Sequence, residues 1–296
     1  MSPAKNIPQS VLARLRNKAK EGNFEYQQIL TRYGLERMLY RLSISDHAGA
    51  FLLKGAMLFN LWFDIPVRPT TDVDMLGYGD HGLDTLQTIF RDICTIQADD
   101  GIAFDPATVE AAEIRKESNY AGVRVTFTGF IDKVRCPIQV DIGYGDAVTP
   151  GAEDVAYPVL LDDMPSPALR AYPRYTVVAE KTEALISLAM ANTRMKDYFD
   201  LWILSRHSDF EGEVMQRALV ATLERRKTPA DPQPLGLTDD FAQDATKLAQ
   251  WRGFIKKNKL EAPELPAVID ELRAFLLPVL AERVINQRWT AGGQWK

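Results

Sequence analysis

The spacing of hydrophobic and polar positions changes near the middle of the chain. Up to about residue 146, short segments with strand-like patterns predominate, whereas from residue 177 onward apolar residues recur every three or four positions, as on one face of a helix. The predicted strands are 51–53, a segment beginning at residue 72, 109–117, 121–131 and 136–146. The predicted helices of the second half are 177–191, 194–206, 211–226, 239–257 and 264–285. The pattern therefore predicts an α+β fold, with a mixed sheet and helices on one side followed by an all-helical part.

Three more helices are expected in the first half, at 10–20, 24–43 and 84–96. Ser10 and Asn23 are the expected N-caps of the first two. Residues 118–120 would form a hairpin turn between two of the strands. Residues 147–176 contain five prolines and little periodicity, so they are expected to cross between the two halves of the chain.

The basic residues of the expected 24–43 helix allow two interpretations. Arg32, Arg37 and Arg41 are spaced four or five residues apart, roughly along one face. A solvated helix face is the favoured interpretation, and an RNA-contacting ridge is the alternative. The other candidate basic residues for RNA contact are Arg14, Arg16, Lys18, Lys20, Arg225, Arg226, Lys227, Lys256, Lys257 and Lys259.

Composition excludes several classes of protein. The 296 residues are 46% hydrophobic and 25% charged, which is typical of a globular protein of one or two domains. We expect no membrane span, because no run of 18 apolar residues occurs, and the first 20 residues do not resemble a secretory signal. The two cysteines lie far apart, which favours a reducing cytoplasm, and the three histidines show no zinc-ligand spacing. A net charge of −5 argues against a general nucleic-acid coat protein, although an enzyme that holds one RNA end remains compatible with it.

The first candidate site lies in the stretch FLLKGAMLFNLWFDIPVRPTTDVDML, residues 51–76. It predicts a buried strand, a Lys-Gly turn, a helix of about two turns, an arginine-bearing loop and a second strand. Because side chains alternate across a strand, Asp72 and Asp74 would share one face. Two such carboxylates repel each other unless a cation neutralises them, which suits Mg²⁺ bound to a nucleoside triphosphate. The alternative is a solvated strand with two surface aspartates.

A third carboxylate, Asp141, lies near the end of the apolar strand 136–146, two residues after Gln139. It could simply begin a turn, as the glycines that follow it indicate. Placed beside the D-x-D strand, it would complete a three-carboxylate metal site.

The second candidate site lies in VVAEKTEALISLAMANTRMKDYFDLWILSR, residues 177–206. Lys181 lies on the first helix of this stretch, and charged residues cluster at the start of the next one. Each feature also has an explanation without a function. Lys181 would be an exposed helix lysine, and Asp197 would be an aspartate favoured by the dipole at the start of a helix. The segment 194–197 would be a solvated corner. The clustered residues are Arg194, Lys196, Asp197 and Asp200.

Taken together, K-G…R-P-T-T-D-V-D-M, the strand aspartate and E-K-T-E-A-L…R-M-K-D-Y-F-D-L resemble the AbiEii/MenT family of nucleotidyltransferase toxins of toxin–antitoxin and phage-defence operons. The resemblance spans roughly residues 45–206. It implies a nucleotidyltransferase-like lobe, residues 1–150, and a helical lobe, residues 151–296, that completes the active site. It also implies transfer of a nucleoside monophosphate from an NTP to RNA, with the tRNA acceptor end as the expected target. A cognate antitoxin is implied, with or without direct contact.

The resemblance assigns roles to individual residues. Asp72, Asp74 and Asp141 would hold Mg²⁺ (or Mn²⁺), and Asp141 is also a candidate general base. Lys181 would contact the triphosphate. At least one of Asp197 and Asp200 should be essential, by orienting Lys181 or Lys196 or by positioning the acceptor hydroxyl.

The nucleotide-binding residues implied by the resemblance come from both candidate sites. Gly55 would let the backbone approach the phosphates, and Arg68 would pair with a phosphate or brace the D-x-D loop. The full nucleotide-binding set is Lys54, Gly55, Arg68, Thr71, Lys181, Arg194 and Lys196. Many family members carry a second Gly or Ser after the motif glycine, whereas this chain has Ala56, which puts the details of triphosphate binding in question.

Two other functions remain open at this point. The same fold and metal site would also serve an enzyme that nucleotidylates a protein or a small molecule, which the acidic net charge slightly favours. A non-catalytic binding protein is the third possibility, although the intact carboxylates and Lys181 argue against it. Mg²⁺-dependent NTP binding separates the third from the other two. The final residues, TAGGQWK, are expected to be mobile or an expression remnant.

Overall fold

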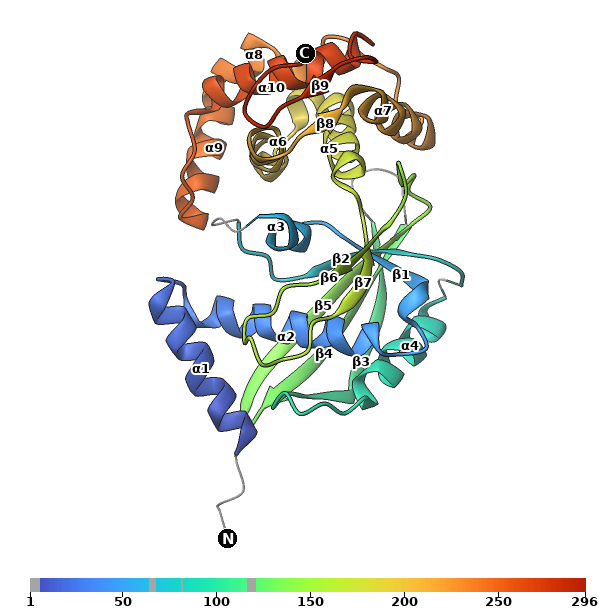
Figure 1. Cartoon of the computed structure of the whole chain (residues 1–296), viewed down its shortest axis with the longest axis vertical. Helices are drawn as coiled ribbons and strands as arrows, with labels where there is room; N and C mark the ends of the chain where they lie inside the picture. Colours follow the sequence, from blue (N-terminus) through green and yellow to red (C-terminus); the bar gives the residue numbers. More distant parts are fainter. Residues whose placement is uncertain (1–5, 64–67, 81, 116–120) are drawn as a thin grey trace. The chain divides into compact units, whose positions relative to one another are not determined.

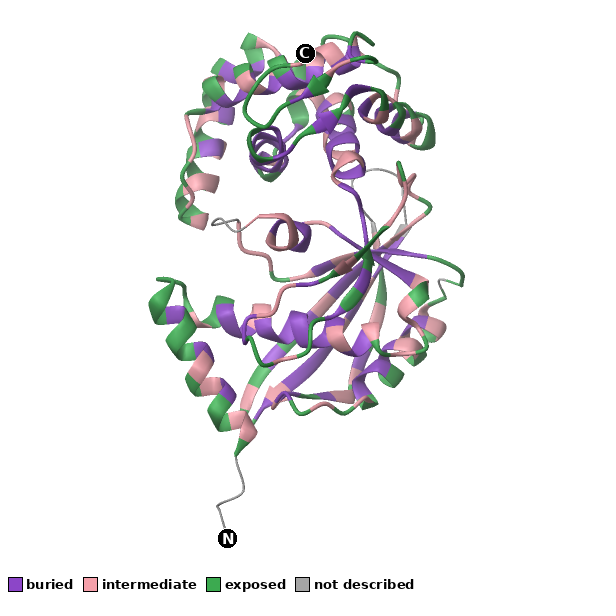
Figure 2. Ribbon diagram, in the orientation of Figure 1, coloured by how far each residue is buried: buried purple, intermediate pink, exposed green. Residues whose placement is uncertain are grey.

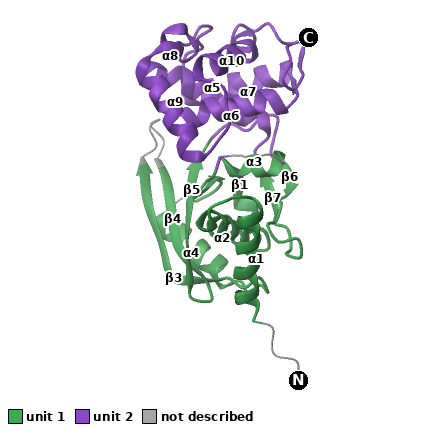
Figure 3. Cartoon of the chain, turned by 90° about the vertical axis from the view of Figure 1, so that its left-hand side faces the viewer, with its two compact units in different colours: residues 1–64, 69–145, 153–171 green, residues 65–68, 146–152, 172–296 purple. Residues whose placement is uncertain are grey.

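A computed structural model of the chain describes residues 6–63, 68–80, 82–115 and 121–296. The chain divides into two compact units (Figure 3), which are described separately below. The first unit contains residues 1–64, 69–145 and 153–171, and the second contains residues 65–68, 146–152 and 172–296. Strands from residues 153–171 therefore belong with the first unit, although the expected lobes divide after residue 150.

The first unit is built on a seven-stranded mixed sheet with the order β3-β4-β5-β2-β1-β7-β6. Its strands are β1 (Phe51–Lys54), β2 (Val73–Gly77), β3 (Ala103–Arg115), β4 (Ala121–Ile131), β5 (Val134–Tyr144), β6 (Glu153–Ala156) and β7 (Ala168–Ala171). The β2–β5 and β1–β7 pairs are parallel, and the other pairs are antiparallel. The predicted β3–β4 hairpin is confirmed, and its turn at 118–120 lies outside the described residues.

Helices cover one face of this sheet, where α2 contacts β5 and β7 and α4 contacts β3 and β4 (Figure 1). The helices of the first unit are α1 (Ile7–Glu21), α2 (Tyr26–Ser43), the 3₁₀ turn η1 (Ala48–Ala50), α3 (Met57–Trp62) and α4 (Leu83–Thr95). Strand residues that face these helices are buried, as the purple segments of Figure 2 show. The α2 glycine, Gly34, allows close packing, because an added Cβ would lie 3.0 Å from Cδ1 of Ile138.

The starts of α1 and α2 differ from the predictions. Asn6, and not Ser10, caps α1, and its side chain accepts a hydrogen bond from the backbone N–H of Gln9 at 3.2 Å. The helix begins earlier because Pro8 is favourable in a first turn. Asn23 has a positive φ of 52° in the connection between the helices, and Glu25 occupies the N-cap position of α2.

The expected solvated arginine face of α2 is wrong, because Arg37 and Arg41 are 0% and 1% exposed. Arg41 pairs with the buried Asp100 through two hydrogen bonds of 2.7 and 3.0 Å. Arg37 contacts Glu36 at 2.8 Å. These side chains reach inward to carboxylates and carbonyls that spacing along one helix does not reveal. Arg37 and Arg41 are consequently excluded from an RNA-contacting ridge.

The segment expected to cross between the halves contributes two strands, β6 and β7, to the sheet edge next to β1. These strands are only four residues long and lie among prolines, which explains why periodicity did not reveal them. The Tyr157 side chain that follows β6 is fully buried, and its hydroxyl donates to the carbonyl of Met57 at 3.3 Å.

The second unit is helical, with one small ribbon of two-residue strands. Its elements are α5 (Arg174–Leu188), η2 (Ala189–Ala191), α6 (Met195–His207), β8 (Phe210–Glu211), α7 (Gly212–Arg226), η3 (Leu235–Leu237), α8 (Asp239–Gln243), α9 (Ala245–Asn258), α10 (Leu265–Leu280) and β9 (Arg288–Trp289). The predicted helix 239–257 is interrupted at Asp244, whose side chain caps α9. In the described parts of the chain, no helix is both long and apolar enough to cross a membrane.

The C-terminal residues pack against this unit, so the expectation of a mobile tail is wrong. The Trp295 ring stacks on Phe275 with centroids 6.0 Å apart, and its indole N–H donates to the Phe275 carbonyl at 2.8 Å. Backbone hydrogen bonds join Arg288 and Lys296 in both directions. The apolar surface of α10 provides the packing that a reading of TAGGQWK alone could not anticipate.

Candidate functional site

Four charged residues on adjacent strands form a row across the sheet of the first unit. Asp74 on β2 lies between Asp141 on β5 and Lys54 on β1, and it is in register with both. On the next strand, β4, Arg124 lies opposite Asp141. Neighbouring strands lie about 4.8 Å apart. The row therefore places two carboxylates side by side, flanked by one basic residue at each end.

The pleat of the sheet explains why this row faces away from α2 and α4. Val73 and Met75 alternate with Asp74, and their register partners Val140 and Ile142 alternate with Asp141. These four apolar side chains are at most 1% exposed, in the layer beneath the helices. Burial of this apolar set fixes the register, so the charged residues must occupy the opposite face.

Asp72 lies just before β2, where the structure shows a bend, so the predicted strand start is shifted by one residue. The hydroxyl of Thr70 donates to Oδ1 of Asp72 at 2.7 Å and so orients this carboxylate. The side chain of Thr71, which the motif suggested for nucleotide binding, is exposed. Asp72 and Asp74 are both partly accessible to solvent.

Asp141 is 6% exposed, and both of its oxygens are held by Arg124. Nε of Arg124 donates to Oδ1 at 2.8 Å, and Nη2 donates to Oδ2 at 2.9 Å. These hydrogen bonds, and the negative charges of Asp141, Asp72 and Asp74, raise the pKa of the Arg124 guanidinium. Arg124 was not predicted. A signal did exist, because it is the single charged residue within the strand AGVRVTFTGFI.

Gly55 follows β1 and has a φ of +74°, which favours glycine over every other residue. An added Cβ would lie 2.2 Å from Oδ2 and 2.7 Å from Cβ of Asp74. The motif glycine therefore has two tasks in this structure: it makes the turn into α3, and it leaves room for the Asp74 side chain.

A separate charged cluster lies within the second unit, where α5 and α6 bring Lys181 to Asp197 and Asp200. Nζ of Lys181 is 2.6 Å from Oδ1 of Asp197 and 2.8 Å from Oδ2 of Asp200. The Lys181 side chain is 13% exposed, and those of the two aspartates are at most 1% exposed. The possibility that Lys181 is merely an exposed helix lysine is therefore wrong.

Two arginines complete this cluster. Arg68 donates to both oxygens of Asp200 at 2.9 and 3.0 Å, and Nε of Arg194 donates to Oδ2 of Asp197 at 2.6 Å. Burial by itself would raise the pKa of both aspartates, but the positive charges outweigh it and hold these pKa values below the usual range. Burial would likewise lower the pKa of Lys181, whereas the charges of the two aspartates raise it.

Lys196, one residue before Asp197, differs from Lys181 in that its surroundings lower the pKa of its ammonium. Although Lys196 is solvent-exposed, crowding by neighbouring atoms and then the positive charge of Arg68 lower this pKa. The cluster thus contains four basic residues and two carboxylates, an excess of positive charge that suits an anionic ligand. Its members are Arg68, Lys181, Arg194, Lys196, Asp197 and Asp200.

The carboxylates of the first unit fit a divalent cation of the Mg²⁺ type. Mg²⁺ in nucleotide enzymes is held by one or two protein carboxylates, with phosphate oxygens and water completing the octahedron. Asp72 and Asp74 supply such hard oxygen ligands. Among the described residues, no group of three or more acidic, histidine or cysteine side chains is arranged to hold a metal ion. This is consistent with an Asp141 whose two oxygens are held by Arg124.

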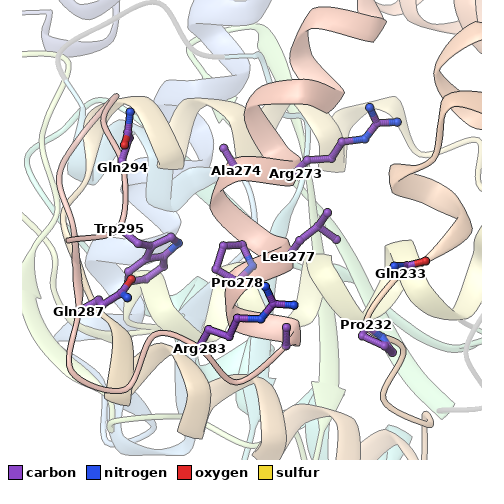
Figure 4. Close-up of a pocket in the computed structure, with 11 residues that line it drawn as sticks. Pro232, Gln233, Arg273, Ala274, Leu277, Pro278, Arg283, Gln287, Gln294 and Trp295 are labelled. Carbon is purple, nitrogen blue, oxygen red and sulfur yellow. The ribbon is translucent and has the colours of Figure 1, made fainter.

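A hollow of about 580 Å³ lies elsewhere in the second unit (Figure 4). Leu277, Pro278 and Trp295 form part of its wall. Its Arg273 is held by Leu237, Asp239 and Asp270. None of the residues predicted for chemistry lines this hollow, so it is not the candidate site.

Comparison with known families identifies the chain. The model of the AbiEii family, described as the nucleotidyl transferase AbiEii toxin of a type IV toxin–antitoxin system, matches residues 37–276. The match covers well over half of the chain, and the chain therefore belongs to the AbiEii family of nucleotidyltransferase toxins. It is a nucleotidyltransferase, and the family implies an NTP substrate and an antitoxin partner.

Similar solved structures exist in Helicobacter pylori. The crystal structure of JHP933 matches with a TM-score of 0.48 and 16% identity, covering 88% of this chain and 93% of that one. A second crystal structure, of an H. pylori protein provisionally named a nucleotidyltransferase, matches with a TM-score of 0.49 and 16% identity, covering 88% of this chain and 96% of that one. Likeness at this level carries no argument about function. No curated protein sequence matches the chain significantly.

Proposed function

We propose that this toxin transfers a nucleoside monophosphate from an NTP to RNA, at the acceptor end of tRNA, and that the reaction requires Mg²⁺ or Mn²⁺. The observation that carries the proposal is the pairing of Asp74 with Asp141 across β2 and β5, beside the Gly55 turn, in a chain of the AbiEii family. Adjacent carboxylates on one face of a sheet are stabilised by positive charge, which Arg124 supplies at Asp141 and a bound metal ion would supply at Asp72 and Asp74.

The residues of the first unit are assigned to the metal and the phosphates. Asp72 and Asp74 would hold the cation, which supplies charge neutralisation at the reacting phosphorus. Gly55 would let the backbone approach the phosphates. The acceptor hydroxyl forms the new O–P bond at the α-phosphorus while the bond to the β-phosphate oxygen breaks and pyrophosphate leaves. Asp141 is our candidate for the base that takes the hydroxyl proton and for the third metal ligand.

The residues of the second unit are assigned to the triphosphate. An ammonium has three donors, and two of those of Lys181 point to Asp197 and Asp200. We assign the third to a phosphate oxygen. The aspartates then act by orienting Lys181, with Arg68 and Arg194 bracing them in turn. Arg194 and Lys196 add positive charge for the same ligand.

The test is a labelling experiment. The full chain is incubated with a divalent cation and each α-³²P-labelled NTP separately, with total tRNA or with a cell protein extract as acceptor. We expect label on tRNA with a preferred NTP, and loss of label with a chelator. Label on protein alone, or on neither acceptor with any NTP, would refute the RNA target. Nucleotide binding without transfer would favour the non-catalytic alternative.

Three further parts of the proposal concern biology. The description of the family as part of a type IV toxin–antitoxin system supports an antitoxin, and we propose that it counteracts this chain without stable contact. We also propose a role in phage defence and action in the cytoplasm. Co-expression with a candidate antitoxin, followed by co-purification, tests the first part. Rescue of growth without co-purification is the expected result, and stable co-purification would contradict it.

A further inference from the structure

The ion pair between Arg124 and Asp141 bears directly on the proposed metal site. Two hydrogen bonds occupy both oxygens of Asp141, and Gln139 lies on the same side of β5, two residues earlier. With its amide oxygen turned toward Arg124, Gln139 is 3.2 Å from both Nε and Nη2. The guanidinium occupies one lone pair on each oxygen of Asp141, so a divalent cation bound to the remaining lone pairs would be repelled by its positive charge.

The reason for the pair lies in the neighbouring strand. Asp141 is almost fully buried beside Asp74, and an unpaired buried carboxylate next to another negative charge is strongly disfavoured. Arg124 removes this cost. A divalent cation at Asp74 and Asp141 would remove the same cost, so the guanidinium and the cation have overlapping tasks.

We propose that Arg124 is a positioning residue that competes with the divalent cation for Asp141. Asp141 exchanges the Arg124 guanidinium for the cation, and the strength of the ion pair thereby sets the affinity of the first unit for metal. This inference rests on the proposed function, because it takes Asp141 to be a metal ligand.

The two side chains differ in a way that makes the exchange feasible. The Arg124 side chain is 41% exposed, whereas that of Asp141 is 8% exposed. A long, flexible arginine that already reaches solvent can withdraw without burying its charge. Asp141 remains in the sheet, so the movement belongs to Arg124.

The experiment measures Mn²⁺ binding to the full chain by electron paramagnetic resonance, without NTP, so that the result does not depend on activity. We expect Arg124→Gln to bind Mn²⁺ about fivefold more tightly than the unaltered protein, which corresponds to the loss of one moderately strong ion pair. Arg124→Lys keeps the charge but loses the bidentate geometry, so it should lie between them. Arg135→Gln, an equal charge change at the exposed far end of β5, is the matched control and should leave the affinity unchanged.

The Arg124→Gln substitution made in an Asp141→Asn variant distinguishes competition for Asp141 from simple repulsion of the cation by Arg124. In Asp141→Asn, the ion pair is absent, so adding Arg124→Gln should have no further effect on Mn²⁺ affinity. An equal gain in both backgrounds would mean that Arg124 acts only as a nearby positive charge, and would overturn the exchange. Weaker Mn²⁺ binding in Arg124→Gln would also overturn it, because Arg124 would then orient Asp141 for the metal.

Two controls distinguish a failure of this inference from a failure of the metal assignment. Circular dichroism must show that each variant is folded, and Arg124→Lys serves if Arg124→Gln is not. If Mn²⁺ binds neither the unaltered protein nor Arg124→Gln, the metal assignment itself is wrong and the inference falls with it. If Mn²⁺ binds and Asp72→Ala abolishes binding, but Arg124→Gln has no effect, the metal assignment stands and only the inference fails.

Discussion

The two charged clusters of this protein are built on opposite principles. In the first unit, Asp72 and Asp74 lie at and beside a sheet strand, partly open to solvent, with one carboxylate directly beside another across β2 and β5. In the second unit, Asp197 and Asp200 are wholly buried, and each contacts two basic side chains. The first arrangement leaves Asp72 and Asp74 partly accessible to solvent, whereas the second encloses its two aspartates among positive charges.

The difference in burial and pairing distinguishes residues whose role is to bind a ligand from residues that also stabilise the fold. A partly exposed carboxylate such as Asp72 adds little to stability, so its removal should reduce activity without unfolding the protein. A buried carboxylate between two cations cannot be removed without leaving those cations uncompensated. Each prediction below tests one side of this contrast.

The largest expected effect is on transfer in Asp72→Ala. Loss of a metal-holding carboxylate should lower nucleotide transfer about a thousandfold. The free energy of unfolding should change by less than about 1 kcal/mol, because the variant loses one hydrogen bond from Thr70 but relieves repulsion from Asp74. Labelling and urea unfolding measure the two quantities. Glu153→Ala, an exposed carboxylate on β6 of the same sheet, should change neither.

In the second unit, Asp200→Asn should reduce the free energy of unfolding by roughly 3 kcal/mol, because it leaves Arg68 and Lys181 with less compensation. Urea unfolding of the two proteins provides the comparison. Glu213→Gln breaks an exposed pair with Arg217 and should cost at most about 0.5 kcal/mol. A loss for Asp200→Asn as small as that of the control would remove the contrast between the units.

Gly55→Ala should destabilise the first unit by about 2 kcal/mol, because alanine is strained at φ of +74° and its Cβ would displace Asp74. Transfer should fall with it. Gly49→Ala is the matched control, since no atom lies within 4 Å of the added Cβ. Retention of full activity by Gly55→Ala would show that the position of Asp74 is unimportant.

Acid should remove the contribution of Asp197 and Asp200 to stability. Their pKa values are held below the ordinary value, so this contribution is complete above about pH 4 and is lost as the pH falls further. The difference in unfolding free energy between the unaltered protein and Asp197→Asn should therefore be constant from about pH 7 to 5 and narrow below about pH 4. A difference that stays constant in acid would argue against the lowered pKa values.

The smallest expected effect is in Lys196→Met. Since its surroundings lower the pKa of Lys196, removing this charge should not reduce stability, whereas Lys181→Met should. Thermal unfolding of the pair is the measurement. Equal losses would mean that the cluster does not distinguish its two lysines.

The sequence identified every member of the second cluster but not how they pair, and it missed one member of the first cluster. Alternation on β2 and β5 places Asp74 and Asp141 on one face, and the apolar Val73 and Val140 establish that face without any tertiary information. Register across four strands could not be predicted, however, so Arg124 was missed. In the second unit, the pattern located Lys181 and Asp200 on helices, but the partnership of Arg68 with Asp200 spans 132 residues and depends on tertiary packing.

The fold predictions failed where local signals were weak or misleading. The α+β class and most helices of the second half follow directly from periodicity, but four-residue strands among prolines leave too little pattern to detect. The prediction that the arginines of α2 are exposed was wrong because a charged side chain can be buried when it pairs with a buried carboxylate. Arg41 pairs with Asp100 in this way. Both errors concern contacts that are distant along the chain.

The docked C-terminal residues also have a spectroscopic consequence. Of the five tryptophans, only Trp62 belongs to the first unit, and Trp295 is stacked on Phe275 in the second. Trp251 and Trp289 are also buried there. Intrinsic fluorescence should therefore report mainly on the helical unit, while circular dichroism in the far ultraviolet reports on both. Recorded together during denaturation, the two signals would show whether the units unfold as one or in sequence.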